Sequence, residues 1–145
     1  MSGIDIPINE KCAFCEYLSG ARPYTILRRD NHTATLVTRE QRGVPHLLVI
    51  PIKHVPTILE LEDHQAESLM LAIREAAKAI DWAYNRQGIS IWQNNGTPSH
   101  QTIAHLHFHV AGTLGEGGTK LGNVSEISIQ ETEHIASSLE GYFRN

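Results

Sequence analysis

The stretch His105-Leu106-His107-Phe108-His109-Val110 places a histidine at every second position, with bulky apolar residues between them. Side chains alternate between the two faces of a β-strand, so a strand over residues 103–111 would present three imidazoles on one side and send the apolar residues into a core. Neighbouring rings on that face would lie about 6.5–7 Å apart, close enough to hold one phosphate or one metal ion together. The stretch therefore predicts a strand of the sheet and the chemistry of the site.

The patterns on either side of this stretch predict an α+β fold with an antiparallel sheet of about five strands. Short strands are expected over 24–28, 32–38, 46–50 and 89–93. Between them, apolar residues recur at steps of three and four over 66–84, which predicts one long helix, with Gly88 just past its end. A short N-terminal helix over 12–19, ending at Gly20, and a C-terminal helix over 127–142 complete the prediction.

The composition is that of an ordinary globular domain. A chain of 145 residues with 41% hydrophobic and 19% charged residues suits a single domain over 1–145. The net charge of −4 argues against general nucleic-acid binding. No stretch is long and apolar enough to span a membrane, and the first ten residues lack the apolar core of an export signal. With only two cysteines, a reducing cytoplasm is the expected compartment.

The alternating histidines have three interpretations. They could simply be the polar face of a strand, but three in five positions is far more than such faces normally carry. They could be a three-histidine metal centre, as in zinc hydrolases. They could also form a phosphoryl-group site, where one neutral imidazole attacks phosphorus and its neighbours donate hydrogen bonds to the oxygens. The preceding loop favours this third interpretation, because Asn94, Gln101 and Thr102 can donate to a phosphate without adding charge.

At this point the sequence resembles a known family. Residues 101–111, with Gln-Thr ahead of the alternating histidines, resemble the signature of the histidine-triad (HIT) family. His46-Leu47-Leu48-Val49-Ile50-Pro51 and the turn to His54 resemble the second hallmark of that family. Cys12-Ala13-Phe14-Cys15 resembles the opening of many bacterial members. The resemblance covers about residues 12–111 and implies a HIT-like fold.

The resemblance also implies roles for the triad and its surroundings. His107 would be the nucleophile, forming a nucleotidyl-histidine that water or another acceptor resolves, and His109 would hold the phosphate oxygens. Thr102 would assist the phosphate or the leaving group. Further contacts with the substrate would come from residues that match the family pattern, namely His46 near the α-phosphate, and Asn94 and Gln101 on phosphates. Thr38 stands where relatives carry an Asp or Asn for the ribose hydroxyls.

The two cysteines are separate from this chemistry. Zinc-bearing relatives complete such a pair with the histidine after the Ile-Pro strand and the first histidine of the triad. The resemblance therefore implies a structural zinc ion held by Cys12, Cys15, His54 and His105, with no catalytic metal. The alternative is two ordinary buried cysteines beside a metal-free His105. Trp92, in the strand that leads to the loop, is expected to pack in the core.

The resulting hypothesis is a cytoplasmic hydrolase or transferase acting on nucleotide phosphoramidates or dinucleoside polyphosphates through covalent His107. A non-catalytic nucleotide-binding or scaffold protein with the same fold is the alternative, and a metallohydrolase that uses all three histidines as ligands is a third. The expected partners are a purine nucleotide or nucleotide conjugate and a second copy of the chain, since relatives are usually homodimers. Neither nucleic acid nor a membrane is expected as a partner.

Overall fold

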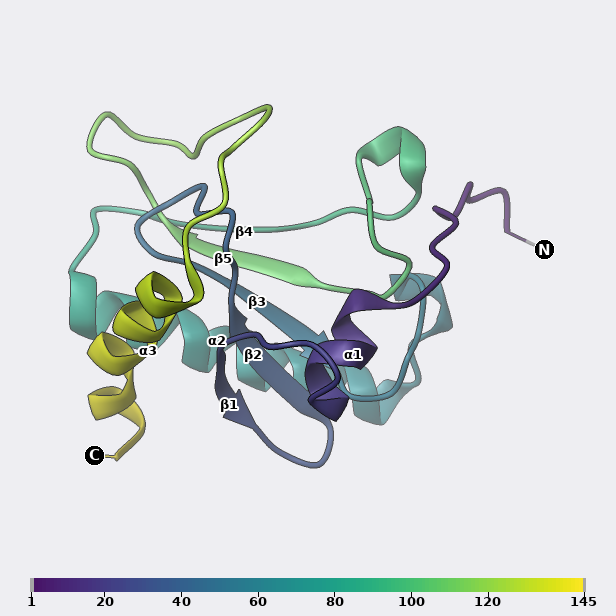
Figure 1. Cartoon of the computed structure of the whole chain (residues 1–145), viewed down its shortest axis with the longest axis horizontal. Helices are drawn as coiled ribbons and strands as arrows, with labels where there is room; N and C mark the ends of the chain where they lie inside the picture. The colour runs from purple at the N-terminus through teal and green to yellow at the C-terminus, as the bar shows by residue number, and fades with distance from the viewer. Residues whose placement is uncertain (1, 145) are drawn as a thin grey trace.

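Five antiparallel strands form one sheet in the computed structural model, which describes residues 2–144 (Figure 1). The strands are β1 (Ile26–Arg29), β2 (Thr33–Val37), β3 (His46–Pro51), β4 (Ile89–Gln93) and β5 (Phe108–Gly112). Their order across the sheet is β1-β2-β3-β5-β4. Each neighbouring pair is antiparallel. The predicted α+β class and antiparallel sheet are confirmed.

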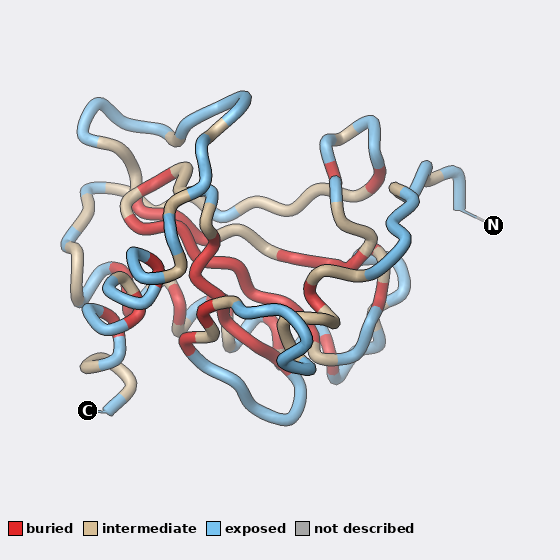
Figure 2. The backbone as a smooth tube through the Cα atoms, in the orientation of Figure 1, coloured by how far each residue is buried: buried red, intermediate tan, exposed pale blue. Residues whose placement is uncertain are grey.

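One face of the sheet is covered by the long helix α2 (Asp63–Tyr84), with α3 (Ile129–Arg144) packed beside it. The apolar spacing along α2 turns one stripe of side chains toward β3 and β5. The buried members of this stripe are Leu69, Ile73, Ala76, Ala79 and Ile80. They join residues of β3 and β5 in the larger of two apolar clusters. Figure 2 shows the inner strands of the sheet buried in the middle of the molecule, while the edge strands β1 and β4 are partly exposed.

The other face of the sheet is covered by the short helix α1 (Ala13–Ser19). Its Phe14 packs with Ala34, Leu36, Leu48 and Ile50 in the second apolar cluster. Because β2 and β3 lie between two layers, all of their residues are buried. This second face also carries the histidines, so α1 lies next to the predicted site.

The histidine stretch forms less strand than predicted. β5 begins at Phe108, so the expected strand over 103–111 is wrong in its first half. The neighbouring strand β3 ends at Pro51, whose nitrogen carries no hydrogen for a sheet ladder. The N–H of Leu106 bonds instead to the carbonyl of Val55 at 2.7 Å. Leu106 nonetheless enters the larger core cluster, so the apolar residues of the stretch lie where the alternation placed them.

The C-cap of the long helix α2 is a different residue from the one predicted. Asn85 adopts the left-handed conformation with φ 49° and donates its N–H to Asp81, so it is the C-cap in place of Gly88. Asparagine tolerates this conformation better than other side-chain-bearing residues. The C-terminal helix runs over Ile129–Arg144, two residues later than expected. None of the helices among residues 2–144 is both long and apolar enough to cross a membrane.

Two glycines allow the backbone to cross itself beside the start of β3. A Cβ atom added to Gly43 would lie 2.4 Å from the carbonyl oxygen of Gly112, and one added to Gly112 would lie 2.2 Å from that of Val44. Hydrogen bonds from Val44 N–H to Gly112 and from Gly112 N–H to Pro45, of 2.7 and 3.0 Å, close the crossing. Only glycine at both positions permits this approach.

Candidate functional site

His107 lies just before β5 with one ring nitrogen held by the backbone. Its Nδ1 is 2.7 Å from the carbonyl oxygen of His105. A carbonyl only accepts, so Nδ1 carries the proton and Nε2 keeps its lone pair. The residue is 8% exposed, and burial lowers the pKa of His107 below its ordinary value. A neutral ring with a free Nε2 is the form that a nucleophilic histidine needs.

Phe14 connects the helix α1 to this ring. Its ring meets those of His107 and His105 edge-on, with centroid distances of 5.1 and 5.5 Å. Phe14 lies in the sequence between Cys12 and Cys15, and is itself 2% exposed. The packing of α1 therefore holds the His107 ring from the side and keeps water from that side of it.

His109, in β5, lies between two further rings. Nε2 of His46, from β3, is 3.0 Å from its Nδ1, and the indole of Trp92 stacks on it with centroids 4.6 Å apart and an interplanar angle of 2°. Burial lowers the pKa of His109 to about 2 and that of His46 to about 4, so both rings are neutral at pH 7. Core packing is the favoured sequence prediction for Trp92, over contact with a base or a partner subunit, but Trp92 contacts the site because β4 pairs it with His109. The rings of His107 and His109 are 5.2 Å apart.

Gln101 braces the loop between β4 and β5. The residue is 1% exposed, and its amide nitrogen donates to the carbonyls of Pro56 and Ile103 at 2.7 and 3.0 Å. Its amide oxygen accepts the N–H of Gly96 at 2.7 Å. Both N–H groups and the oxygen are therefore used within the protein. The contact of Gln101 with a phosphate stays a prediction.

The N-terminal arm holds the same loop from outside. The side chain of Asn9 donates to the carbonyl of Thr102 at 3.1 Å and accepts the N–H of Ala104 at 2.8 Å. Thr102 is exposed and Asn94 half-buried, so both can meet a ligand. Sequence reasoning missed Asn9, because a contact across more than ninety residues has no local signal.

Thr38 follows the end of β2 and is 6% exposed. Its hydroxyl oxygen accepts the N–H of Glu40 at 3.1 Å, and its carbonyl accepts the amide of Gln41 at 2.6 Å. The same Gln41 side chain bonds the backbone N–H and carbonyl of His46 at 2.8 and 2.9 Å. Thr38 thus helps to shape the turn that leads to His46. Its contact with a ribose stays a prediction.

Two cysteines and two histidines come together beside the triad, as the resemblance implied. The possible ligand atoms of Cys12, Cys15, His54 and His105 all lie within 4.8 Å of one another. Nε2 of His105 is 2.9 Å from the carbonyl of Pro51, so the proton sits there and Nδ1 presents its lone pair to the cluster. From this Nδ1 the sulfurs of Cys12 and Cys15 are 3.3 and 3.7 Å away, and Nδ1 of His54 is 3.1 Å away.

This geometry fits a tetrahedral zinc ion. With zinc bonds of about 2.3 Å to sulfur and 2.0–2.1 Å to nitrogen, tetrahedral ligand atoms lie about 3.3–3.8 Å apart. Burial and the neighbouring Cys12 raise the pKa of Cys15 to about 11, so a cation that binds there must displace a proton. Four protein ligands leave no open position for water, which is typical of a structural site.

The three histidines of the triad do not surround one point. Nδ1 of His105 faces the cysteines, Nδ1 of His107 faces a carbonyl, and Nδ1 of His109 faces His46. A shared three-histidine metal centre would need one nitrogen of each ring to converge. The arrangement instead gives the three rings different surroundings. His105 faces the cysteine cluster, His107 keeps a free nitrogen, and His109 lies beside it as a neighbour that can donate a hydrogen bond.

Comparison with known proteins identifies the family. The sequence matches the model of the HIT domain over residues 19–115, which is more than half of the chain. The chain belongs to the HIT family. It is 30% identical over 108 residues to protein hit of Bacillus subtilis, covering 74% of each chain. It is 28% identical over 99 residues to adenosine 5'-monophosphoramidase hnt1 of Schizosaccharomyces pombe, covering 68% of this chain and 71% of that protein.

Among solved structures, a zinc-bound histidine triad family protein from Mycobacterium smegmatis has the same fold as this HIT protein. The TM-score is 0.77 at 22% sequence identity, and the alignment covers 92% of this chain and 94% of the other. This likeness establishes the HIT-like fold, with its five-stranded sheet, long helix and two shorter terminal helices.

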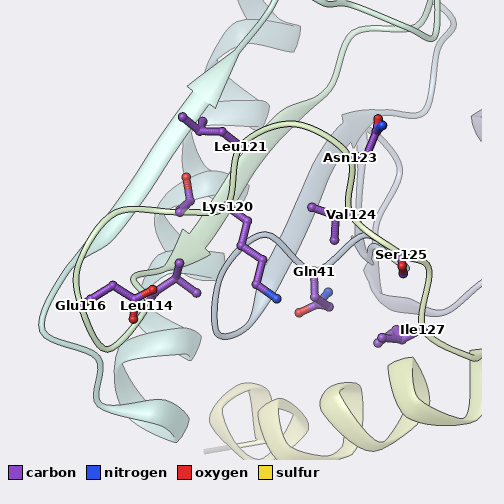
Figure 3. A pocket seen from close by; sticks show the side chains of 10 residues that line it. Gln41, Leu114, Glu116, Lys120, Leu121, Asn123, Val124, Ser125 and Ile127 are labelled. Atoms are coloured by element: carbon purple, nitrogen blue, oxygen red, sulfur yellow. The ribbon is translucent and has the colours of Figure 1, made fainter.

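A cavity of about 680 Å³ in this HIT protein lies between the glycine-rich segment after β5 (residues 112–122) and the turn before β3 (Figure 3). Its walls carry polar residues such as Lys120 and Asn123 beside apolar ones such as Leu114 and Val124. Gln41 also lines the cavity, and the side chain of Lys120 extends toward Gln41. Gln41 thus connects the cavity wall to His46, whose backbone it binds.

The buried histidines predict a loss of stability in weak acid. The pKa values of folded His46 and His109 lie below the ordinary 6.5, so below pH 6.5 the unfolded chain binds protons that the folded chain does not. As the pH is lowered below 6.5, the free energy of unfolding should fall by up to about 1.4 kcal/mol per pH unit for each of these histidines. Urea unfolding at pH 7, 6 and 5 measures this slope.

A His46→Gln variant separates this effect from protonation of the metal cluster. The slope of its free energy of unfolding against pH should be smaller by about 1.4 kcal/mol per pH unit, because one titrating ring is gone. Asp30 does not interfere, since its backbone hydrogen bonds keep its pKa below the ordinary 3.8 despite partial burial. Equal slopes for the variant and the unchanged protein would contradict the assignment.

Proposed function

We propose that this protein cleaves nucleotide conjugates at the α-phosphate through a covalent nucleotidyl intermediate on His107. The observation that carries the proposal is the hydrogen bond from Nδ1 of His107 to the carbonyl of His105, which leaves Nε2 free on a neutral ring. Two further residues support the proposal by their position. His109 lies beside the nucleophile, and Thr102 is exposed on the adjoining loop.

In the first step, the Nε2 lone pair of His107 attacks phosphorus and the bond to the leaving group breaks. The leaving group departs with the bonding electron pair, and an amine takes up a proton as it leaves. The hydrogen bond from Nδ1 to a carbonyl supports the positive charge that develops on the ring. His109 would donate to a phosphate oxygen, where negative charge builds up in the transition state.

In the second step, water attacks the phosphorus and releases a proton to solvent, the phosphorus–Nε2 bond breaks and the ring recovers its lone pair. This proton balances the one that a leaving amine takes up from solvent in the first step. The products are a nucleoside monophosphate and the released amine, phosphate or nucleotide. Another acceptor in place of water would make the reaction a transfer. The name of the Schizosaccharomyces pombe relative, adenosine 5'-monophosphoramidase, supports a purine nucleotide joined to an amine as substrate. An adenylylsulfatase of Arabidopsis thaliana, 25% identical over 103 residues, supports variation in the leaving group.

We also propose that Cys12, Cys15, His54 and His105 hold a structural zinc ion. The four ligand atoms lie within 4.8 Å of one another, and the cysteine–histidine and histidine–histidine distances of 3.1–3.7 Å are close to tetrahedral spacing. The zinc-bound Mycobacterium smegmatis relative also supports this assignment. Bound zinc would cross-link the N-terminal arm to the segments after β3 and before β5. The carbonyl that orients the nucleophile belongs to His105, so a fixed His105 also fixes His107.

The chain is proposed to act as a single domain and as a homodimer in a reducing cytoplasm. β4 is an edge strand of the sheet, and its Ile91 is 51% exposed. An edge strand with an apolar exposed side chain is suited to cover by another subunit. A reducing compartment keeps Cys12 and Cys15 available as thiolate ligands.

Trapping the intermediate tests the proposal. The protein is mixed with an adenosine phosphoramidate, quenched within milliseconds and digested, and the peptide that contains His107 is analysed by mass spectrometry. An added adenylyl group on His107, lost in acid as phosphoramidates are, is the expected result. Binding of the nucleotide without turnover or adduct would favour the non-catalytic alternative. Turnover without an adduct, abolished by chelation, would favour a metallohydrolase.

A further inference from the structure

Three aromatic rings, those of His46, Trp92 and His109, contact one another between the start of β3 and the triad. The indole of Trp92 stacks on His109, and its centroid lies 5.2 Å from that of His46. The rings of His46 and His109 are themselves 5.1 Å apart and joined by a hydrogen bond of 3.0 Å between ring nitrogens. His46 is 1% exposed. These contacts leave neither ring free to turn.

Both nitrogens of His46 are occupied by the protein. Nδ1 lies 3.1 Å from the backbone N–H of Arg42 and 3.0 Å from the carbonyl of Glu40, and Nε2 meets His109. His46 therefore has no nitrogen left for a substrate. Its influence on a bound phosphate must pass through His109.

The two contacts at Nδ1 demand opposite protonation states. The N–H of Arg42 can only donate, so it needs a lone pair on Nδ1, whereas the carbonyl of Glu40 needs a proton there. Glu40 is an exposed residue and Arg42 a half-buried one. Within residues 2–144 the N–H of Arg42 has no acceptor other than this nitrogen. An unsatisfied N–H is costly, which favours the lone pair on Nδ1 and the proton on Nε2.

We propose that His46 is a positioning residue that sets the tautomer of His109. It accepts from Arg42 on Nδ1 and donates its Nε2–H to Nδ1 of His109, so the proton of His109 stays on Nε2. All hydrogen bonds of the chain then point the same way, from the Arg42 backbone to the bound phosphate. In the opposite tautomer His109 would turn a lone pair toward an anion, which is repulsive. The proposal rests on the proposed function and gives His46, expected near the α-phosphate, a role that acts through His109.

The peptide of Arg42 that begins this chain is itself anchored. The guanidinium of Arg42 donates to the carbonyls of Lys120 and Gly122 at 3.2 and 2.7 Å. The N–H of Lys120 donates back to the Arg42 carbonyl at 2.8 Å. The glycine-rich segment thereby fixes the turn whose N–H reaches His46.

The direct test is the tautomer of His109 in the whole protein saturated with adenosine 5'-monophosphate. Nitrogen-15 NMR distinguishes a protonated from an unprotonated ring nitrogen, and assignment uses the His109→Gln spectrum. We expect Nε2 of His109 and Nε2 of His46 to be protonated and both Nδ1 atoms to be unprotonated. A His109 ring protonated on Nδ1 would overturn the proposal. Because this measurement needs no turnover, it stands even if the proposed reaction fails.

Two variants at His46 add a kinetic test. His46→Leu removes the donor to His109, and we expect kcat to fall about 10²-fold with KM changed less than about threefold. The amide nitrogen of His46→Gln can donate to Nδ1 of His109 and should restore kcat to within about tenfold of the unchanged protein. Exposed His134, replaced by glutamine, serves as the control.

A purely structural role for His46 would give a different pattern. Leu and Gln would then lower kcat in proportion to the loss of thermal stability, and His109 would keep one tautomer in both variants. If His46→Leu leaves both kcat and the His109 tautomer unchanged, the proposal is wrong. If His46→Leu does not fold, His46→Ala takes its place in both measurements, and a His109 ring protonated on Nε2 in that variant as well would overturn the proposal.

Discussion

Replacing His107 with alanine is expected to lower kcat on the order of 10⁴-fold or more, because the reaction loses its nucleophile. The ring of His107 packs on Phe14 at the edge of the second core cluster, so its removal should cost only about 1–2 kcal/mol of stability. The measurement is single-turnover hydrolysis of an adenosine phosphoramidate, with circular dichroism to verify the fold.

The matched control for this experiment is His134→Ala. His134 is exposed on α3, and its replacement should leave kcat unchanged. Adenylylated peptide should disappear only in the His107 variant. Turnover by His107→Ala within tenfold of the unchanged protein would contradict the proposed nucleophile.

Loss of the metal cluster is expected to have the largest effect on stability. In the double variant Cys12→Ser with Cys15→Ser, zinc content should fall below one-tenth per chain. The melting temperature should drop by more than about 10 °C, because metal binding contributes directly to folding. Elemental analysis and thermal unfolding measure the two effects.

Chelation supplies the control for this second prediction. A strong chelator should lower the melting temperature of the unchanged protein toward that of the double variant, and should leave the double variant unaffected. Activity should fall as well, since Phe14 and His105 both lie against the nucleophile. Equal melting temperatures for the two proteins without chelator would show that the cluster holds no structural metal.

Much of the fold follows from local patterns. The short runs that predicted β2 and β3 and the three-four spacing along α2 were enough to place these elements within a few residues. The errors have tertiary causes. β5 is shorter than predicted because Pro51 ends β3, and the N–H of Leu106 finds an acceptor at Val55, outside the sheet.

The sequence predicted which residues form the candidate site better than it predicted the hydrogen bonds and ring contacts between them. The spacing of His105, His107 and His109 identified the triad, and resemblance supplied the remaining ligands of the metal cluster. No local pattern shows that Gln101 is buried, with all its hydrogen bonds made to the backbone. Nor does one show that Trp92 stacks on His109, since both depend on strand pairing.

The crossing of Gly43 and Gly112 has a consequence for engineering. Backbone hydrogen bonds at this point, from Val44 and to Pro45, anchor the ends of two loops without help from side chains. Residues 115–118, at the tip of the loop after β5, could therefore be exchanged for sequences of other lengths while β3 and β5 keep their register and Lys120 and Gly122 still bind Arg42. Grafting at this tip would change the wall of the cavity at Glu116 and leave the reacting groups in place.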